Sequence, residues 1–178
     1  MLKTHYEYWE ETKLIKQLEK IKGVYQEPRD SSHYKFVISA FYQDIQSNKG
    51  AIIFAVCRGK ISEGLDFSDD AARSVVLIGI PYPLVIDPKT IMKKHYLSIK
   101  QSQMSSTFRL TGQQWYCQQA TRALNQAIGR VIRHKEDYGN IILIDSRFNN
   151  PNQISQISSW IRDRVLAYDN PNVALRHY

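Results

Sequence analysis

One stretch of the chain carries basic and amide side chains at helical spacing. On a wheel of 100° per residue, four residues fall within about 80° of Arg122: Gln126, Gly129, Arg130 and Arg133. Apolar residues fall on the opposite side: Ala120, Leu124, Ile128 and Val131. Guanidinium groups one turn apart, beside a glycine that permits close approach, suit a phosphate ligand. The alternative is that these residues form only a solvated basic face, and this helix alone does not exclude it.

A second polar group lies in residues 57–67, directly after a short apolar run. Ligands of open α/β sheets bind where loops leave the C-terminal ends of strands. Gly64 would let a ligand approach the backbone, and Asp66 would accept a hydrogen bond from a ribose or position a water. Arg58 and Lys60 would hold a phosphate backbone. Taken alone, Asp66 is equally well explained as a turn or cap residue.

Other candidates have simpler interpretations. Trp115, Tyr116 and Trp160 are expected to be core or interface aromatics rather than base-stacking platforms. His134 is expected at a helix end, interacting with the helix dipole rather than serving as a catalytic base. The Lys-Lys-His cluster at residues 93–95 is expected to be a solvated helix face.

The composition favours an anionic partner. The chain has 24 Lys and Arg against 17 Asp and Glu, a net charge of +7, which points to nucleic acid or nucleotide unless the charge is only surface solvation. Cys57 and Cys117 form no Cys-x-x-Cys spacing, so we expect no disulfide framework and no metal site in this chain. No apolar run approaches the roughly 20 residues of a membrane span. The protein is expected to be soluble and intracellular, without a membrane partner.

Strands and helices that would position these residues alternate along the chain. Short apolar runs rich in β-branched residues predict strands buried on both faces of a parallel sheet, and they span 51–56, 75–80 and 141–144. A short extended piece is predicted around Val24 and Tyr25. Helices are predicted at 10–22, after the cap Asp30, at 88–100 after Asp87, from Thr111 to about His134, and from Pro151 through Leu166. A Ser-rich loop is predicted through Thr107. This alternation predicts an α/β layer fold.

Two strings are distinctive enough to resemble a known family. AVCRGKISEGLDFSD, at 55–69, and QAIGRVIRHKEDYG, at 126–139, resemble motifs V and VI of superfamily 2 helicases, in the form found in the xeroderma pigmentosum group D-like iron-sulfur DNA helicases. The likeness runs from about Tyr8 to Tyr168. The strings IGIPYP, TGQQWY and AYDN resemble the branch that holds the regulator of telomere elongation and Fanconi anaemia group J helicases.

The resemblance implies a motor with two RecA-like domains that hydrolyses ATP in the cleft between them and moves along single-stranded DNA. The chain, residues 1–178, resembles the second, C-terminal helicase domain: a RecA-like α/β domain with a mostly parallel central sheet flanked by helices. It is expected to be a fragment, since the phosphate-binding loop, the magnesium-binding box and the four cluster cysteines of the family have no counterpart here. ATP and Mg²⁺ would be shared with the first domain, and the iron-sulfur cluster would lie in the missing part.

The same resemblance assigns roles to single residues. The expected nucleotide-facing groups are Gly64, Asp66, Gln126, Arg130 and Arg133, with Arg130 and Arg133 catalytic as arginine fingers. The expected DNA-facing groups are Arg58, Lys60 and Ser62. The family implies a nuclear protein that unwinds DNA in repair or telomere maintenance, with DNA and the first domain as partners, while the chain by itself should be inactive.

Two other classes of function stay open from the sequence. The chain could be a non-catalytic nucleic-acid-binding α/β module, which the lack of a phosphate-binding loop would favour. It could also be an α/β interaction domain whose basic face is only solvated. Salt-dependent DNA binding would separate these two alternatives.

Overall fold

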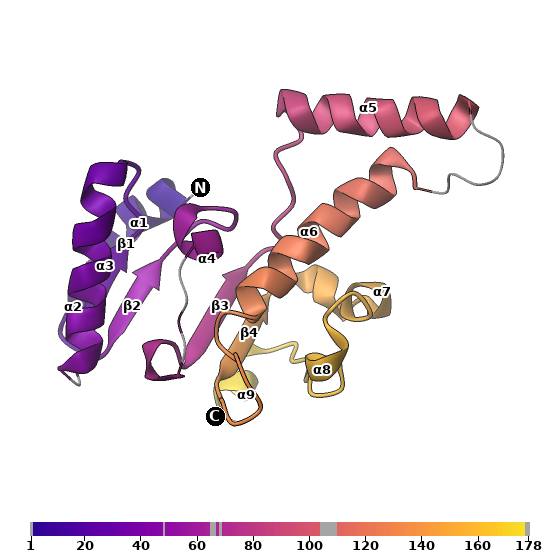
Figure 1. Ribbon diagram of the computed structural model, residues 1–178. Coiled ribbons are helices and arrows are strands. Elements are labelled where there is room, and N and C mark those ends of the chain that lie inside the picture. The colour runs from indigo at the N-terminus through magenta and orange to yellow at the C-terminus, as the bar shows by residue number, and fades with distance from the viewer. Residues whose placement is uncertain (1, 48, 65–66, 68, 104–109, 177–178) are drawn as a thin grey trace. The chain divides into compact units, whose positions relative to one another are not determined.

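The computed structural model of the chain describes residues 2–47, 49–64, 67, 69–103 and 110–176 (Figure 1). Asp66 and the end of the predicted Ser-rich loop, up to Thr107, lie outside these residues. The chain forms two compact units. The first comprises Met1–Val75 and Gln126–Asn140, and the second comprises Val76–Asn125 and Ile141–Tyr178.

The first unit is built around two parallel strands. β1 (Gly23–Gln26) pairs with β2 (Ala51–Phe54), with Tyr25 opposite Ile53, and α3 (Ser31–Gln46) packs against both strands. The Tyr25 hydroxyl donates to Ala40 O and to Asp44 Oδ2 at 2.8 Å. These bonds link the middle of β1 to the last turns of α3, because the Tyr25 side chain extends from the strand to the helix.

The core of this unit is aromatic and aliphatic. Phe41 of α3 packs against Phe67, with ring centroids 5.8 Å apart, and both belong to a buried cluster with Ile61. Asp30 caps α3 by accepting a hydrogen bond from Ser32 N, as predicted. Phe67 and Ile61 both lie in the segment after β2, so this core anchors the segment at 55–69 that resembles motif V.

The predicted helix at 10–22 is wrong in its extent. The chain forms α1 (Leu2–Glu11) and α2 (Leu14–Glu19), separated at Lys13, whose φ of 60° is left-handed. Thr12 Oγ1 donates back to Tyr8 O, which closes α1 with a side-chain bond. The apolar spacing that suggested one helix continues across this break, because periodicity alone does not show where the backbone reverses its handedness.

A second pair of strands joins the two halves of the sequence. β3 (Ser74–Ile78) pairs with β4 (Asn140–Ile144). Asn140 N donates to Arg73 O at one end and Gly79 N donates to Ile144 O at the other, so the strands run in the same direction. The structure therefore confirms the predicted α/β class with parallel strands flanked by helices.

The prediction that these strands are buried on both faces is wrong for β3. Leu77 is 5% exposed, but its neighbours Val76 and Ile78 are 50% and 72% exposed. Alternation of this kind means that only one face of the strand is covered. A continuously apolar sequence does not reveal which face that is.

Two long helices make up much of the second unit (Figure 1). α5 (Pro88–Gln103) begins at Asp87, whose carboxylate accepts from Thr90 N and Thr90 Oγ1, and α6 (Gly112–Ile128) begins after Thr111. Tyr116 of α6 is buried, stacks on Tyr82 and donates to Pro83 O, which confirms its predicted place in the core. Trp160 is 50% exposed and is not a core residue.

The predicted helix from Pro151 through Leu166 is also wrong. Asn150 caps a first turn as expected, but the chain forms only short helices, α7 (Pro151–Ile154) and α8 (Ser159–Arg162), after the 3-10 turn η2 (Ser146–Asn149) and before α9 (Pro171–Arg176). Ser158 N and Ser158 Oγ both donate to Asn125 Oδ1, and this tertiary bond replaces a helical one. Within the described ranges, no helix is both long enough and apolar enough to cross a lipid bilayer.

Removal of the cap of α6 should weaken the fold. Thr111 Oγ1 accepts from Gln114 N at 3.0 Å while Gln114 Oε1 accepts from Thr111 N at 2.9 Å, the reciprocal capping box predicted from the sequence. We expect Thr111→Ala to lower the free energy of unfolding by about 1 kcal/mol, measured by urea denaturation. Gln118→Ala, at an exposed position in the middle of α6, should have a much smaller effect. Equal losses from both variants would contradict the capping role.

Candidate functional site

The segment that carries motif V is held by a carboxylate from a neighbouring strand end. Glu27, next to β1, accepts hydrogen bonds from Val56 N at 2.9 Å and from Ile61 N at 3.0 Å. A Cβ added to Gly59 would lie 2.6 Å from both carboxylate oxygens of Glu27, so only glycine fits at this point of the turn. One side chain thereby closes the turn between β2 and the short helix α4 (Lys60–Gly64).

The predicted DNA-facing residues lie on this turn. Arg58 and Lys60 are exposed, and Arg58 has a left-handed φ of 68°. This strained backbone conformation, uncommon for a non-glycine residue, is held by the surrounding turn. The Ser62 hydroxyl instead donates to Val56 O and Gly59 O, so its contacts are inside the turn. Gly64 is exposed at the end of α4, and among the described residues no group lies within 4 Å of an added Cβ there.

The segment that carries motif VI departs from the predicted helix. α6 ends at Ile128, six residues before His134, and the next residues form tighter turns in which Arg130 N donates to Ala127 O and Val131 N donates to Ile128 O. Arg130 and Arg133 therefore do not share one continuous helical face with Arg122. The backbone leaves the helix after Ile128, while Ile128 and Val131 stay buried at 0% and 2% exposure.

A hydrogen bond joins the two motifs. Arg130 Nε donates to Ser62 O at 3.1 Å, across 68 positions of sequence. Both residues belong to the first unit. The structure thus brings one predicted catalytic residue together with one residue of the motif V segment. Gln126 lies exposed in the last turn of α6, and Arg133 is exposed beyond its end.

Asp137 organises the loop that follows α6. Its side chain is 1% exposed, and its carboxylate accepts from Arg133 N at 3.0 Å, Tyr138 N at 2.9 Å and Arg73 Nη1 at 2.8 Å. The Arg133 amide, followed by the Tyr138 amide and the Arg73 guanidinium, holds the pKa of the Asp137 carboxyl below its usual value. The Arg73 guanidinium also lies 4.0 Å from the centre of the Tyr138 ring, so one arginine contacts both Asp137 and Tyr138 at the end of this loop.

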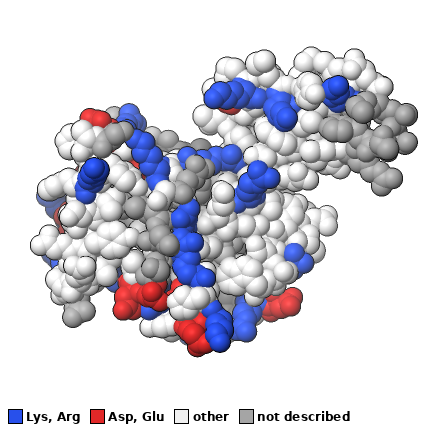
Figure 2. Space-filling model, viewed as in Figure 1, with Lys and Arg blue, Asp and Glu red and all other residues white. Residues whose placement is uncertain are grey.

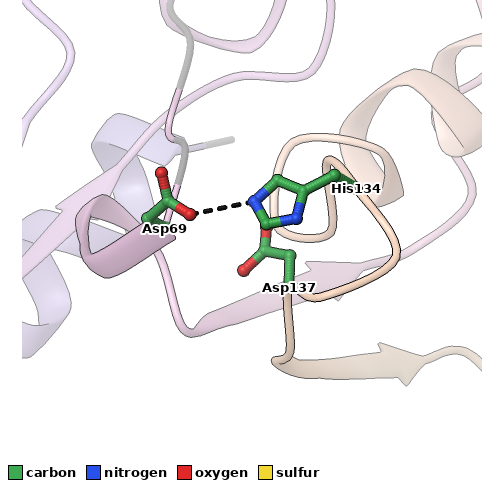
Figure 3. Close-up of side chains that lie close together, drawn as sticks. All are labelled: Asp69, His134 and Asp137. Carbon is green, nitrogen blue, oxygen red and sulfur yellow. Dashed lines mark hydrogen bonds and ion pairs between the residues drawn. The ribbon is translucent and has the colours of Figure 1, made fainter.

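His134 bonds to an acid from another part of the chain. Its Nε2 lies 2.9 Å from Asp69 Oδ1, as Figure 3 shows, and Asp69 begins the 3-10 turn η1 (Asp69–Ala71). The predicted interaction of His134 with a helix dipole is wrong, because α6 ends before it. The hydrogen bond that His134 makes to the Asp69 carboxylate is the largest cause that raises the pKa of His134 above its usual value.

Asp69, His134 and Asp137 each offer one possible metal-ligand atom, all within 4.8 Å of one another (Figure 3). Hydrogen bonds account for this cluster without a cation. Asp137 already accepts from two backbone amides and an arginine, and a positive guanidinium beside it disfavours a second cation. The cluster is best explained as a clasp between η1 and the loop after α6.

Several of these residues were not identified from the sequence. Glu27, Asp69, Arg73 and Asp137 make the contacts that hold both motif segments. Asp137 lies in a sequence pattern typical of a turn before a strand. Such a pattern does not show which donors hydrogen-bond to the side chain. Glu27 directly precedes Pro28, and nothing in the sequence pattern indicates that its side chain contacts residues 56 and 61.

The sequence is similar to that of known helicases. Residues 1–164 match the family model described as Helicase C-terminal domain. A protein named Regulator of telomere elongation helicase 1 homolog, from Drosophila willistoni, is 47% identical over 165 residues, which is 93% of this chain and 16% of that protein. The protein of the same name from Drosophila melanogaster is 46% identical over 165 residues, again 93% of this chain and 16% of the relative.

The chain therefore spans about 16% of the length of these curated relatives. A solved structure titled XPD helicase aligns with a TM-score of 0.47 and 25% sequence identity, over 88% of this chain and 30% of that one.

The role of Glu27 predicts a local defect when it is removed. Glu27→Ala leaves the amides of Val56 and Ile61 without their acceptor, which should lower the free energy of unfolding by about 1–3 kcal/mol and speed hydrogen exchange at both amides. Glu27→Gln keeps one carbonyl acceptor and should lose less. Glu11→Ala, at an exposed position of α1, serves as the control. Unchanged exchange at Ile61 in Glu27→Ala would show that another group holds the turn.

The pair of His134 and Asp69 predicts a pH dependence. A pKa raised in the folded state means that this pair stabilises the fold fully below the usual histidine value of about 6.5, and the stabilisation is lost as pH rises through the raised pKa. In an NMR titration, His134 should titrate above 6.5, and Asp69→Asn should move its midpoint down. Asp163→Asn, an exposed acid of the second unit, should leave it in place. A His134 midpoint that ignores Asp69→Asn would refute the pairing.

Proposed function

Because this chain belongs to the helicase C-terminal domain family, we propose that it is the second, RecA-like motor domain of an ATP-dependent DNA helicase. In this proposal residues 1–178 supply motifs V and VI to an ATP site that a first domain of a longer protein completes. The observation that carries it is the bond from Arg130 Nε to Ser62 O, which joins the two motifs within one unit.

The proposed role of Arg130 and Arg133 is to stabilise charge during phosphoryl transfer. An arginine brought by a second body to the transferred phosphoryl group is worth roughly 1,000- to 100,000-fold in rate, or about 4–7 kcal/mol. The bond to Ser62 O fixes one edge of the Arg130 guanidinium, and the hydrogen bond from Arg133 N to Asp137 fixes the backbone of Arg133. Because its guanidinium is already held, Arg130 loses less side-chain freedom when a phosphate arrives.

The nucleotide-facing role extends to Gly64, Asp66 and Gln126 by the family resemblance. Gly64 and Gln126 are exposed, which supports access by a ligand. ATP supplies the phosphoryl group that is transferred to water, and Mg²⁺ neutralises its phosphates.

The described carboxylates of this site do not fit Mg²⁺, since Glu27, Asp69 and Asp137 are engaged by backbone amides or basic side chains. We therefore assign Mg²⁺ binding to the first domain, and the iron-sulfur cluster to a part of the protein outside this chain.

Single-stranded DNA is the proposed polymer substrate. Arg58 and Lys60 lie exposed on the turn that Glu27 closes, and the chain carries a net charge of +7. Phosphate contacts from such residues give affinity without sequence specificity. The names of the relatives refer to telomere elongation, which supports a proposed role of the longer protein in telomere maintenance or DNA repair in the nucleus.

Substitution of the two arginines tests the motor assignment. In a longer protein that contains this chain and a first helicase domain, Arg130→Ala and Arg133→Ala should each lower kcat for DNA-stimulated ATP hydrolysis by at least about 100-fold. KM for ATP should change far less, because the loss falls on the transition state. Lysine should restore only a minor part of the rate, since it lacks the planar fork of arginine.

Arg164→Ala, at an exposed position of the second unit, is the matched control for this experiment. If all three alanine variants keep normal turnover, the basic residues after α6 are only a solvated face.

The isolated 178-residue chain tests the division of labour between domains. It should show no ATP hydrolysis with Mg²⁺ and single-stranded DNA, because the triphosphate and metal are bound elsewhere. It should still bind oligodeoxythymidine weakly, with an affinity that falls as salt rises. Arg58→Ala combined with Lys60→Ala should reduce this binding further, measured by fluorescence anisotropy. Turnover that persists through repurification would contradict the half-site account.

A further inference from the structure

The outer face of α5 is an exposed apolar stripe. Ile91, Met92, Tyr96 and Ile99 are 53%, 71%, 51% and 38% exposed, and on a helical wheel they fall within an arc of about 140°. The buried residues of the helix, Thr90 and Leu97, lie on the opposite side. Contiguous apolar surface of this kind on a soluble domain marks an interaction site.

α5 is fixed to its neighbour in a way that keeps this stripe outward. A Cβ added to Gly112, the first residue of α6, would lie 2.5 Å from Lys94 O, so the two backbones approach each other closely at that glycine. Lys94 Nζ lies 4.7 Å from the centre of the Tyr116 ring on α6. These contacts occupy the inner side of α5, which leaves the stripe unpartnered among the described residues.

The charge of α5 limits what can cover the stripe. The helix contains four lysines and no acidic residue, and Lys89, Lys93 and Lys100 follow one margin of the stripe on the helical wheel. Figure 2 shows basic side chains with uncharged surface between them along this helix. An acidic partner is therefore favoured over a basic or neutral one.

The same lysines disfavour nucleic acid as the occupant. Lys93 Nζ and Lys100 Nζ lie 5.5 Å and 5.7 Å from the centre of the Tyr96 ring, within the range of cation-π contacts. A base that stacks on this ring must displace both ammonium groups from it. The remaining stripe residues, Ile91, Met92 and Ile99, are aliphatic or thioether side chains that suit apolar side chains of a protein.

We propose that α5 is the docking surface for an acidic amphipathic helix of a partner protein. The apolar face of that helix lies along Ile91, Met92 and Ile99, and its glutamates or aspartates meet Lys89, Lys93 and Lys100. Leu84, Val85 and Ile86, exposed at 72%, 61% and 82%, extend the apolar surface at the start of α5. This proposal uses none of the residues assigned to the nucleotide site and does not depend on that assignment.

A designed peptide tests the proposal on the 178-residue chain. The probe is a fluorescent helix of about 18 residues, or five turns, with leucines at i, i+3, i+4 and i+7 and glutamates beside them. A second peptide carries lysine in place of every glutamate. Fluorescence anisotropy should show binding of the acidic peptide that weakens with added salt, and the lysine peptide should bind at least about tenfold more weakly.

Matched variants locate the binding surface. Met92→Asp should weaken binding of the acidic peptide at least about tenfold, whereas Leu166→Asp, at a residue 72% exposed against 71% for Met92, should not. Both variants should melt near the unchanged chain, because both positions are exposed.

Three results would overturn the proposal: no binding of the acidic peptide, equal binding of both peptides, or no effect of Met92→Asp. Loss of oligodeoxythymidine binding in Met92→Asp without loss of peptide binding would assign the stripe to nucleic acid instead. Dimerisation of the chain that Met92→Asp abolishes, measured by sedimentation, would assign it to a second copy.

Discussion

The need to satisfy one nearly buried carboxylate shapes the region around motif VI. The Asp137 side chain is 1% exposed, and a charge in such a place is costly unless hydrogen bonds and an opposite charge surround it. Its partners are the amides of Arg133 and Tyr138 and the guanidinium of Arg73. Together they fix the loop after α6 against the residue that precedes β3. The bond from Arg130 to Ser62 extends this arrangement to the motif V segment.

Much of the fold could be predicted from the sequence because its signals are local. The capping box at Thr111 and Gln114 and the β-branched runs at β2 and β4 depend on neighbours in the chain, and the structure has them where expected. Predictions failed where a contact outside the predicted helix determines the backbone conformation. α6 stops at Ile128 where turn bonds and Asp137 take over, and the predicted last helix breaks where Asn125 accepts from Ser158.

The candidate site, like the fold, could be predicted only where its signals are local in the sequence. Spacing and resemblance identified Arg130, Arg133 and the motif V segment, but they placed both arginines on one helical face, which the structure corrects. The residues that hold the site, Glu27 and Asp137, act through contacts made across many positions of sequence. No periodicity encodes such contacts. A basic surface around a rigid turn is nonetheless what a domain needs if it presents arginines to a ligand bound by another domain.

We propose that Arg130 reaches the transferred phosphoryl group when the two domains close. The most direct measurement is a crystal structure of a longer protein, containing this chain and a first helicase domain, with ADP, magnesium and aluminium fluoride in place of the transferred phosphoryl group. An Arg130 guanidinium nitrogen should lie within hydrogen-bond distance, about 2.7–3.2 Å, of a fluoride of that group. An Arg130 that points away from the nucleotide in a closed, nucleotide-bound structure would contradict it.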